Sequence, residues 1–120
     1  MTTQPQNHIA PQPNVAIRPA RPDDGPALAV VMAARGGIPS DHAPAAHRLL
    51  DRAPVLVVAE AALLQGTEVV GWSGATRTPL HPGGPAQWLT AGLTVDPAFR
   101  RRGIGHRLLQ AVIEAVGEIG

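Results

Sequence analysis

The run VLVVAEAA, residues 55–62, constrains the fold more than any other feature, because a single glutamate interrupts seven apolar residues. A strand with one face in water alternates apolar and polar side chains, whereas a near-continuous apolar run is typical of a strand covered on both faces. The chain has 120 residues, enough for one core but not for two. The sequence therefore predicts a single sheet that is flanked by helices.

Hydrophobic periodicity and turn residues predict the order β-α-α-β-β-β-α, an α+β (α/β) domain. Strands are expected over residues 14–20, 55–62, 68–76 and 88–95, with a loop over 77–87. A first helix is expected between an N-cap at Asp23 or Asp24 and the pair Gly36-Gly37. A second, shorter helix is expected between an N-cap at Ser40 or Asp41 and Pro54.

The last strand and the last helix have the clearest apolar patterns. The strand alternates, which places Leu89, Ala91, Leu93 and Val95 on one face and Trp88, Thr90, Gly92 and Thr94 on the other. The helix begins at Ile104 and ends near Gly117, with an apolar stripe of Leu108, Leu109, Val112, Ala115 and Val116. Residues 1–13 are polar and rich in proline, which predicts a disordered tail before a domain over residues 14–120.

Composition excludes several classes of protein. The chain has no cysteine, so disulfides, thiolate metal sites and a cysteine nucleophile are excluded. The sequence has neither an H-E-x-x-H motif nor a carboxylate cluster, so no metal site is predicted. The absence of a long apolar stretch and of a signal-peptide pattern predicts a cytoplasmic protein without membrane contact. A net charge of +1 and an aromatic content of 2% argue against a nucleic-acid partner.

One short segment concentrates the positive charge, at the junction of the last strand and the last helix. Arg100, Arg101 and Arg102 stand in a row before Gly103-Ile104-Gly105. A helix N-terminus has unpaired N–H groups that attract anions, and glycine lets a ligand approach the main chain closely. A Walker A loop is excluded because the chain has no lysine, and a Rossmann motif because its third glycine is missing. The junction therefore predicts a site for another phosphate-bearing ligand.

The six residues Arg100 to Gly105 resemble R-x-x-G-x-G, the acetyl-CoA signature of the GNAT acetyltransferase family. An alternating strand before the signature and an amphipathic helix after it strengthen the likeness. Upstream, IRPARPDDGPALAVV resembles the first strand and helix of that family, and VVAEAALLQGTEVVGWSGA its second and third strands. The resemblance covers about residues 15–117 and implies a GNAT-like, mainly antiparallel sheet.

The resemblance implies acetyl-CoA as the acyl donor, with no metal. Main-chain N–H groups of Arg101 to Gly105 would hold the diphosphate, and the arginines would add side-chain charge. The strand edge would bind the pantetheine arm as an added strand would, with a bulge at Gly92 and the Leu93 N–H polarising the thioester. The expected cofactor-binding residues are Leu93, Thr94, Val95, Arg100, Arg101, Arg102, Gly103, Ile104, Gly105 and His106.

The family transfers acetyl directly to an amine, so the resemblance implies a small-molecule or peptide amine acceptor. The catalytic residues are left open. Glu60 and Glu68 stand near strand ends where bases of the family sometimes lie, but solvated charges are the more common role there. His42 and His47 are five residues apart, the wrong helical spacing for one shared ligand, and are interpreted as surface residues. They also fall in the segment that lines the acceptor site in relatives, so contact with the acceptor is the alternative. A surface or structural role is expected for His81, Arg18, Arg21, Trp72 and Trp88.

The sequence also departs from the family pattern. The usual acid is a tyrosine on a later helix, and this chain has no tyrosine and stops at Gly120. Two explanations stay open: a second copy completes the sheet as a homodimer, or the sequence is part of a longer enzyme. Two other functions also stay open. One is a catalytically silent acyl-CoA-binding module, and the other is nucleic-acid binding through Arg100 to Arg107, which requires a steep salt dependence.

Overall fold

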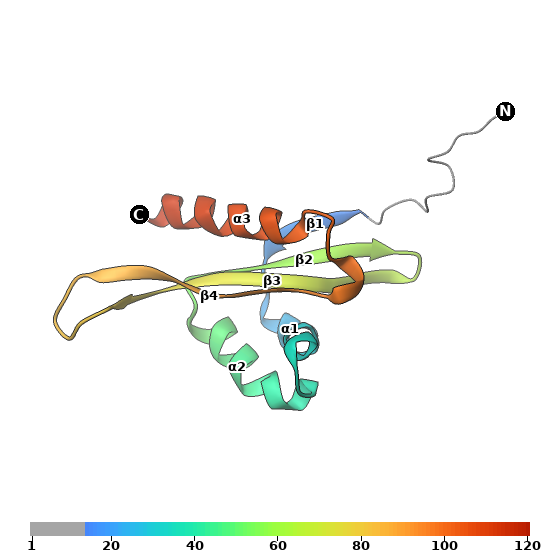
Figure 1. The fold of residues 1–120 in the computed structure, drawn as a ribbon, viewed down its shortest axis with the longest axis horizontal. Coiled ribbons are helices and arrows are strands. Elements are labelled where there is room, and N and C mark those ends of the chain that lie inside the picture. The colour runs from blue at the N-terminus through green and yellow to red at the C-terminus, as the bar shows by residue number, and fades with distance from the viewer. Residues whose placement is uncertain (1–13) are drawn as a thin grey trace.

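The computed structural model describes residues 14–120, so the predicted tail over residues 1–13 lies outside the described residues. The elements follow the predicted order, which confirms the fold class (Figure 1). The strands are β1 (Val15–Pro19), β2 (Val55–Leu63), β3 (Gly66–Pro79) and β4 (Ala86–Val95). The helices are α1 (Gly25–Met32), α2 (Pro39–Arg52) and α3 (Ile104–Ile119), with short 3₁₀ helices η2 (Pro22–Asp24), η3 (Ala33–Arg35) and η4 (Pro97–Phe99).

The four strands form one antiparallel sheet in the order β1-β2-β3-β4, with β1 and β4 at its edges. Helix α3 covers one face, and α1 and α2 cover the other (Figure 1). Strand β2 alternates between these layers. Val55 and Val57 pack in the core under α3, while Val58 packs with α1 and α2. The prediction that this strand is covered on both faces is confirmed.

A bulge divides β4 into two parts. Gly74 pairs with Gly92 but Ala75 pairs with Thr90, so Ala91 is an extra residue in β4. The bulge expected at Gly92 is present there, and Gly92 has a φ of 150°. The strict alternation predicted for this strand is wrong, because an extra residue moves the following side chains to the opposite face. Leu93, Val95 and Trp88 pack on the α3 side, and Ala91 packs on the α1–α2 side.

The helices correct two further expectations. Helix α2 has 14 residues and α1 has 8, so the second helix is the longer one. Its N-cap is Ile38, not Ser40 or Asp41, because Pro39 is well suited to the first helical position. Asp41 accepts a hydrogen bond from the Ile38 N–H at 3.0 Å and thus helps to cap the helix from inside its first turn.

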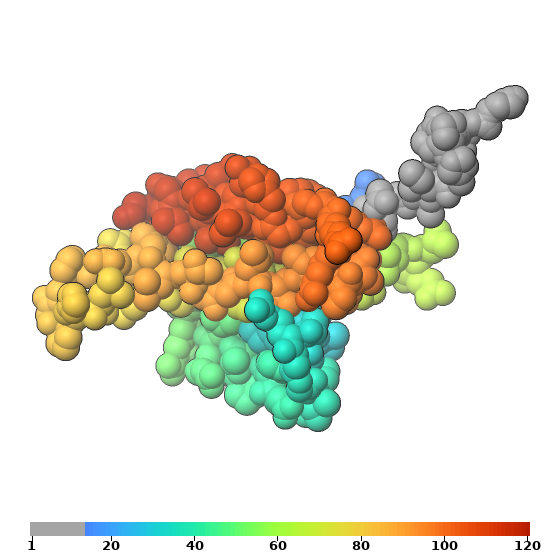
Figure 2. Space-filling view, in the orientation of Figure 1, coloured from blue at the N-terminus to red at the C-terminus, as the bar shows by residue number. Residues whose placement is uncertain are grey.

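The β3–β4 hairpin and α3 are longer than predicted. The loop expected over residues 77–87 is reduced to residues 80–85, because cross-strand pairing continues to Pro79 and Ala86. The resulting hairpin projects beyond the helices (Figure 2). Helix α3 passes Gly117 and ends at Ile119. Leu109 is 38% exposed and so is wrongly assigned to the buried stripe, which contains Ile104, Leu108 and Val112.

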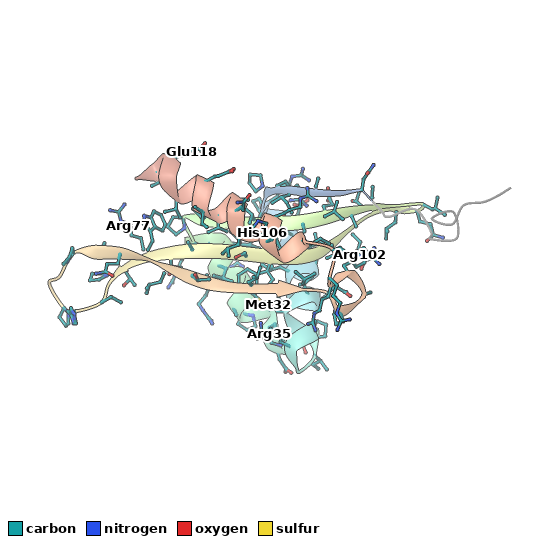
Figure 3. All side chains as sticks on the ribbon, turned by 45° about the horizontal axis from the view of Figure 1, so that its top comes forward. Met32, Arg35, Arg77, Arg102, His106 and Glu118 are labelled. Atoms are coloured by element: carbon teal, nitrogen blue, oxygen red, sulfur yellow. The ribbon has the colours of Figure 1, made fainter. Side chains whose placement is uncertain are left out.

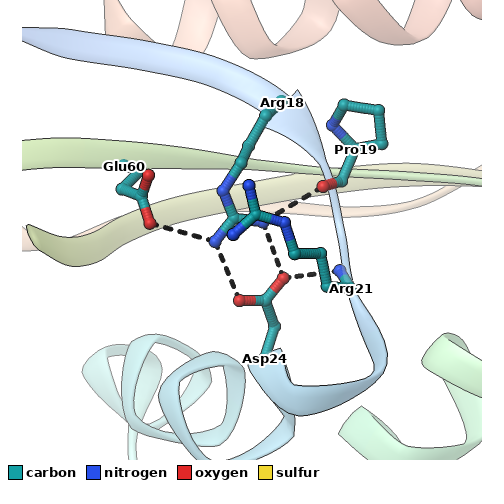
Figure 4. A network of polar contacts seen from close by, with 5 residues as sticks. All are labelled: Arg18, Pro19, Arg21, Asp24 and Glu60. Carbon is teal, nitrogen blue, oxygen red and sulfur yellow. Dashed lines mark hydrogen bonds and ion pairs between the residues drawn. The ribbon is translucent and has the colours of Figure 1, made fainter.

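A network of ion pairs joins the first strand to the first helix and to β2 (Figure 4). Arg18 donates to both carboxylate oxygens of Asp24, at 2.8 and 2.9 Å, and to Glu60 at 3.1 Å. Asp24 is the N-cap residue of α1, one of the two positions predicted, but its side chain does not cap the helix. Its carboxylate accepts from the Arg21 N–H and from Arg18, and this bond to Arg18 holds the pKa of Asp24 below its usual range.

Candidate functional site

The open edge of β4 presents main-chain groups in a regular pattern. The Asp96 N–H donates to Val70 O on β3 at 2.7 Å. Groups that face a neighbouring strand recur at every second residue, so those of Thr94 also face β3. The main-chain groups of Leu93 and Val95 therefore face the open edge. Each of these two carbonyl oxygens accepts from a guanidinium at 3.1 Å, Leu93 from Arg35 and Val95 from Arg100.

A tight turn leads from β4 to α3. The Asp96 carboxylate accepts from the Ala98 N–H at 2.8 Å and begins η4. Two residues then have left-handed backbone angles, Arg101 with a φ of 64° and Gly103 with a φ of 77°. A non-glycine residue in this region costs roughly 1–2 kcal/mol. Left-handed residues next to ordinary ones turn successive N–H groups toward a common point, which is an anion-binding geometry.

The first turn of α3 leaves its N–H groups available. Gly103 is the N-cap and has no side chain with which to cap the helix. The Arg107 N–H bonds to Gly103 O at 3.0 Å. The N–H groups of Ile104, Gly105 and His106 precede that bond and have no carbonyl partner within the helix. They stand at the positive end of the helix dipole.

These parts enclose a groove of about 530 Å³. Most of the predicted cofactor-binding residues meet there. The groove is lined by Arg35, Leu93, Thr94, Val95, Phe99, Arg100, Arg101, Gly103, Ile104 and Gly105. Arg102 and His106 lie outside this lining. The Arg102 guanidinium lies 5.2 Å from the centre of the Phe99 ring and donates to Ala98 O at 3.3 Å, while His106 is exposed on α3 (Figure 3).

The three consecutive arginines thus have different surroundings. Arg100 bonds to the strand edge and Arg102 to the turn. The Arg101 side chain has no hydrogen-bond or ion-pair partner in the part of the chain that the structure describes. Among the three, Arg101 is the guanidinium that is best placed to bind an anion in the groove.

Arg35 is one of two described groove residues that sequence analysis missed. It lies in η3 on the α1 side of the sheet (Figure 3), where the space-filling view shows the segment after α1 touching β4 (Figure 2). Its partner Leu93 is 58 residues away in the chain. No local pattern marks Arg35, because its role depends on the packing of α1 against the sheet. Phe99, which lies in η4 directly before Arg100, was missed as well.

The two glutamates considered as bases do not reach the groove. Glu60 and Glu68 line a separate hollow with Arg18 and Asp24. The hydrogen bond from Arg18 lowers the pKa of Glu60, which makes this carboxylate a weaker base. Their predicted role as solvated strand-end charges holds for Glu68, whereas Glu60 is part of the ion-pair network.

A second hollow, of about 550 Å³, adjoins the groove on the α1–α2 side of the sheet. We call it the arginine pocket. It is lined by Met32, Arg35, His42, Ala45, Arg48, Leu49, Arg52, Ala53, Trp72, Thr76, Ala91 and Thr94. Arg35 and Thr94 line both hollows, so the two are adjacent. The His42 Nε2 lies 2.7 Å from Gly36 O, which holds the ring in place. His47 lines a different hollow, between α1 and α2.

Two further searches covered residues 14–120. They contain no group of three or more His, Asp or Glu side chains arranged to hold a metal ion. None of their helices combines the length and the hydropathy that a membrane crossing requires.

Known proteins share this fold. Solved structures with a similar fold include the aminoglycoside N-acetyltransferase AAC(6')-Iy in complex with CoA, at 18% identity and a TM-score of 0.70, covering 93% of this chain and 75% of that one. A GNAT family N-acetyltransferase (YhbS) from Escherichia coli in complex with CoA has 22% identity and a TM-score of 0.72, covering 94% and 62%. A GNAT family acetyltransferase from Brucella melitensis in complex with acetyl-CoA has 23% identity and a TM-score of 0.66, covering 88% and 70%.

This chain thus spans less than two thirds of the Escherichia coli protein. A comparison with curated proteins gave no match. Residues 29–120 match the profile of the Acetyltransferase (GNAT) family, which is more than half of the chain. With the fold and the strand–turn–helix groove, this match shows that the chain belongs to the GNAT family of acetyltransferases.

Proposed function

We propose that this protein transfers an acyl group, acetyl in the first instance, from acyl-CoA to the primary amine of a small molecule. The observation that carries the proposal is the groove, where a free strand edge leads directly to a left-handed turn and an uncapped helix. The N–H groups of Arg101 to Gly105 and the Arg101 guanidinium would bind the diphosphate. The edge groups of Leu93 and Val95 would bind the pantetheine arm, while Thr94 contributes its side chain. The CoA complexes of similar structures support this assignment.

The chemistry is direct transfer. The amine nitrogen attacks the thioester carbonyl carbon, the Leu93 N–H stabilises the oxyanion, and the C–S bond breaks to release CoA thiolate. The nitrogen gives up one proton, through water, to a base. A thiol with a pKa near 8.5 leaves as thiolate without an obligatory acid. A general acid would raise the rate of this step by about 10²–10⁴-fold. Among the described residues that line the two hollows, His42 is the one imidazole.

A second candidate function is acyl-CoA binding without turnover. It is favoured by the lining of the groove, where the described residues include no Asp, Glu or His. Calorimetry with CoA combined with thiol release from acetyl-CoA in the presence of primary amines separates the two functions. Heat of binding with thiol release supports transfer, and heat without release supports the silent module.

The binding site itself is tested with Arg101→Glu. We expect this change to weaken CoA binding at least tenfold, because a charge-assisted bond is replaced by repulsion. Arg77→Glu, at the far hairpin, is the matched control. Equal CoA affinity in wild-type protein and Arg101→Glu would remove the basis of the proposal.

We also propose that a second copy pairs with the open edge of β4 before the bulge, over residues 86–90, which leaves the edge groups of Leu93 and Val95 to the pantetheine arm. An uncovered edge strand recruits other chains, and Leu80 and Leu89 beside it are 53% and 38% exposed. Sedimentation velocity is expected to show a dimer at micromolar concentration, and a monomer would refute this part.

A further inference from the structure

The arginine pocket, defined above, has an unusual charge for the receptor of a cationic amine. Three arginines, Arg35, Arg48 and Arg52, are among the residues that line it, and its described lining contains neither Asp nor Glu. We propose that the acceptor is an amine that also bears an anionic group, a carboxylate or a phosphate, which Arg48 and Arg52 bind. The inference rests on the proposed acyl transfer and names the class of its acceptor.

The two arginines of α2 are arranged for one shared anion. Arg48 and Arg52 are one helical turn apart, so their side chains lie on the same face, where like charges repel. The carboxylate nearest to Arg52 is Asp51, at 3.7 Å, and these side chains are 78% and 67% exposed, so this pair neutralises little. A bound carboxylate or phosphate would relieve the repulsion and accept paired hydrogen bonds.

The rest of the lining describes the body of the ligand. Met32, Leu49, Trp72 and Ala91 form apolar walls. The buried indole N–H of Trp72 has no acceptor among the described residues. An acceptor with an apolar body suits these walls better than a sugar-like polyol does.

The position of the pocket fits the acceptor rather than the donor. The groove runs from Gly105 along β4 to Leu93, so the thioester would lie at the Leu93 end. The pocket shares Thr94 and then continues to Ala91 and Thr76, away from the diphosphate. An amine that enters from α2 would meet the thioester while its anion stays at the helix. This placement distinguishes the arginines of α2 from those that would bind CoA phosphates.

The charge of the pocket also excludes a class of acceptor. Aminoglycosides are polycations, and a pocket with three arginines and no carboxylate among its described lining residues disfavours them. We therefore expect an acceptor preference different from that of the aminoglycoside acetyltransferase with a similar fold.

Kinetics with matched amines test the proposal. The carboxylate pair is phenylalanine and phenylalaninamide, the phosphate pair is O-phosphoethanolamine and ethanolamine, and kanamycin is the polycation. We expect kcat/KM to favour the anionic member of at least one pair by about tenfold, and the preferred pair identifies the anion. A preference for the neutral members or for kanamycin would overturn the proposal.

Variants locate the preference. The double variant Arg48→Glu and Arg52→Glu is expected to lower kcat/KM for the anionic amine about 100-fold, roughly tenfold for each arginine. The kcat/KM for 2-phenylethylamine and the Kd for CoA are expected to stay within about threefold of the wild-type values. Arg77→Glu is the control for net charge and is expected to change neither. A loss of CoA affinity in the double variant would assign these arginines to the donor and refute the inference.

Binding of the reaction products separates this inference from the proposed transfer. We expect wild-type protein to bind at least one of two anionic products, N-acetylphenylalanine or N-acetyl-O-phosphoethanolamine. We do not expect it to bind N-acetylphenylalaninamide. Binding of the anionic product is expected to be lost in the double variant. If such binding occurs while no amine is acetylated, the pocket stands and the transfer fails. If neither anion binds, the pocket assignment fails whatever the activity.

Discussion

The Arg35 guanidinium donates a 3.1 Å hydrogen bond to the carbonyl oxygen of Leu93, and so joins the end of the first helical segment to the open edge of β4. Both residues line the groove, and Arg35 also lines the arginine pocket. One side chain thus stands at the junction of the proposed donor and acceptor sites. Its contact is exposed, so its value for stability is small while its value for binding is expected to be larger.

Arg35→Ala is therefore expected to lower the free energy of unfolding by less than about 1 kcal/mol, as for an exposed hydrogen bond. The KM values for acetyl-CoA and for the acceptor are both expected to rise, because a cation is lost where the two sites meet. Urea denaturation and steady-state kinetics measure the two effects. Arg35→Lys, which keeps the charge, should recover part of the loss. Unchanged KM values for both substrates would contradict this role.

Gly105→Ala is expected to separate ligand binding from folding. An added Cβ would lie 3.8 Å from Val95 and 3.9 Å from Leu93, which is ordinary contact. Alanine favours a helix over glycine by about 1 kcal/mol, so stability is expected to be equal or higher. The methyl group stands where a diphosphate approaches the main chain, so the Kd for CoA is expected to rise roughly tenfold. If calorimetry gives Gly105→Ala the same Kd for CoA as wild-type protein, the diphosphate does not bind at this position.

Gly92→Ala is expected to destabilise the protein by about 1–3 kcal/mol or more. Gly92 has a φ of 150°, and a Cβ there would lie 2.7 Å from the Trp72 ring, where the buried indole cannot move aside. Gly117→Ala is the matched control, because that helical position has no neighbour within 4 Å of an added Cβ. Gly117→Ala is expected to raise the free energy of unfolding by about 0.5–1 kcal/mol. Chemical denaturation of both variants tests the pair, and a neutral Gly92→Ala would show that the bulge relaxes easily.

Asp24→Asn is expected to lower stability in a pH-dependent way. The hydrogen bond from Arg18 lowers the pKa of Asp24 below its ordinary value of 3.8. The carboxylate therefore stabilises the fold above that pH, and the contribution is lost as the pH falls through the lower pKa of the folded state. The free energy of unfolding of the variant is expected to be about 2–4 kcal/mol lower than that of wild-type protein at pH 7. The difference is expected to shrink progressively below pH about 4.

Urea denaturation at pH 7 and pH 3 measures this difference. Glu60→Gln is the comparison, and its effect is expected to be smaller because the Glu60 side chain is 24% exposed and makes one bond to Arg18. Equal losses for Asp24→Asn at both pH values would show that packing, and not the ion pair, is responsible.

The sequence by itself determined the order of the elements, the burial of β2 and the place of the groove. These features depend on local patterns: the apolar run over residues 55–62, and Gly103 and Gly105 after a strand and before an amphipathic helix. Glycine acts through the backbone angles and the bare main chain of its own position. For the same reason the bulge at Gly92 was expected at the correct residue.

Only the tertiary structure decided which side chains meet. It brought Arg35 to Leu93, left Arg102 and His106 outside the groove lining, and moved Glu60 into a network with Arg18. It also moved Ala91 to the opposite face of the sheet from Leu93 and Val95. Side chains alternate between the two faces along a strand, and one extra residue in β4 shifts this alternation. Contacts between residues distant in the chain depend on how helix and sheet layers pack, and a local pattern has no information about that packing.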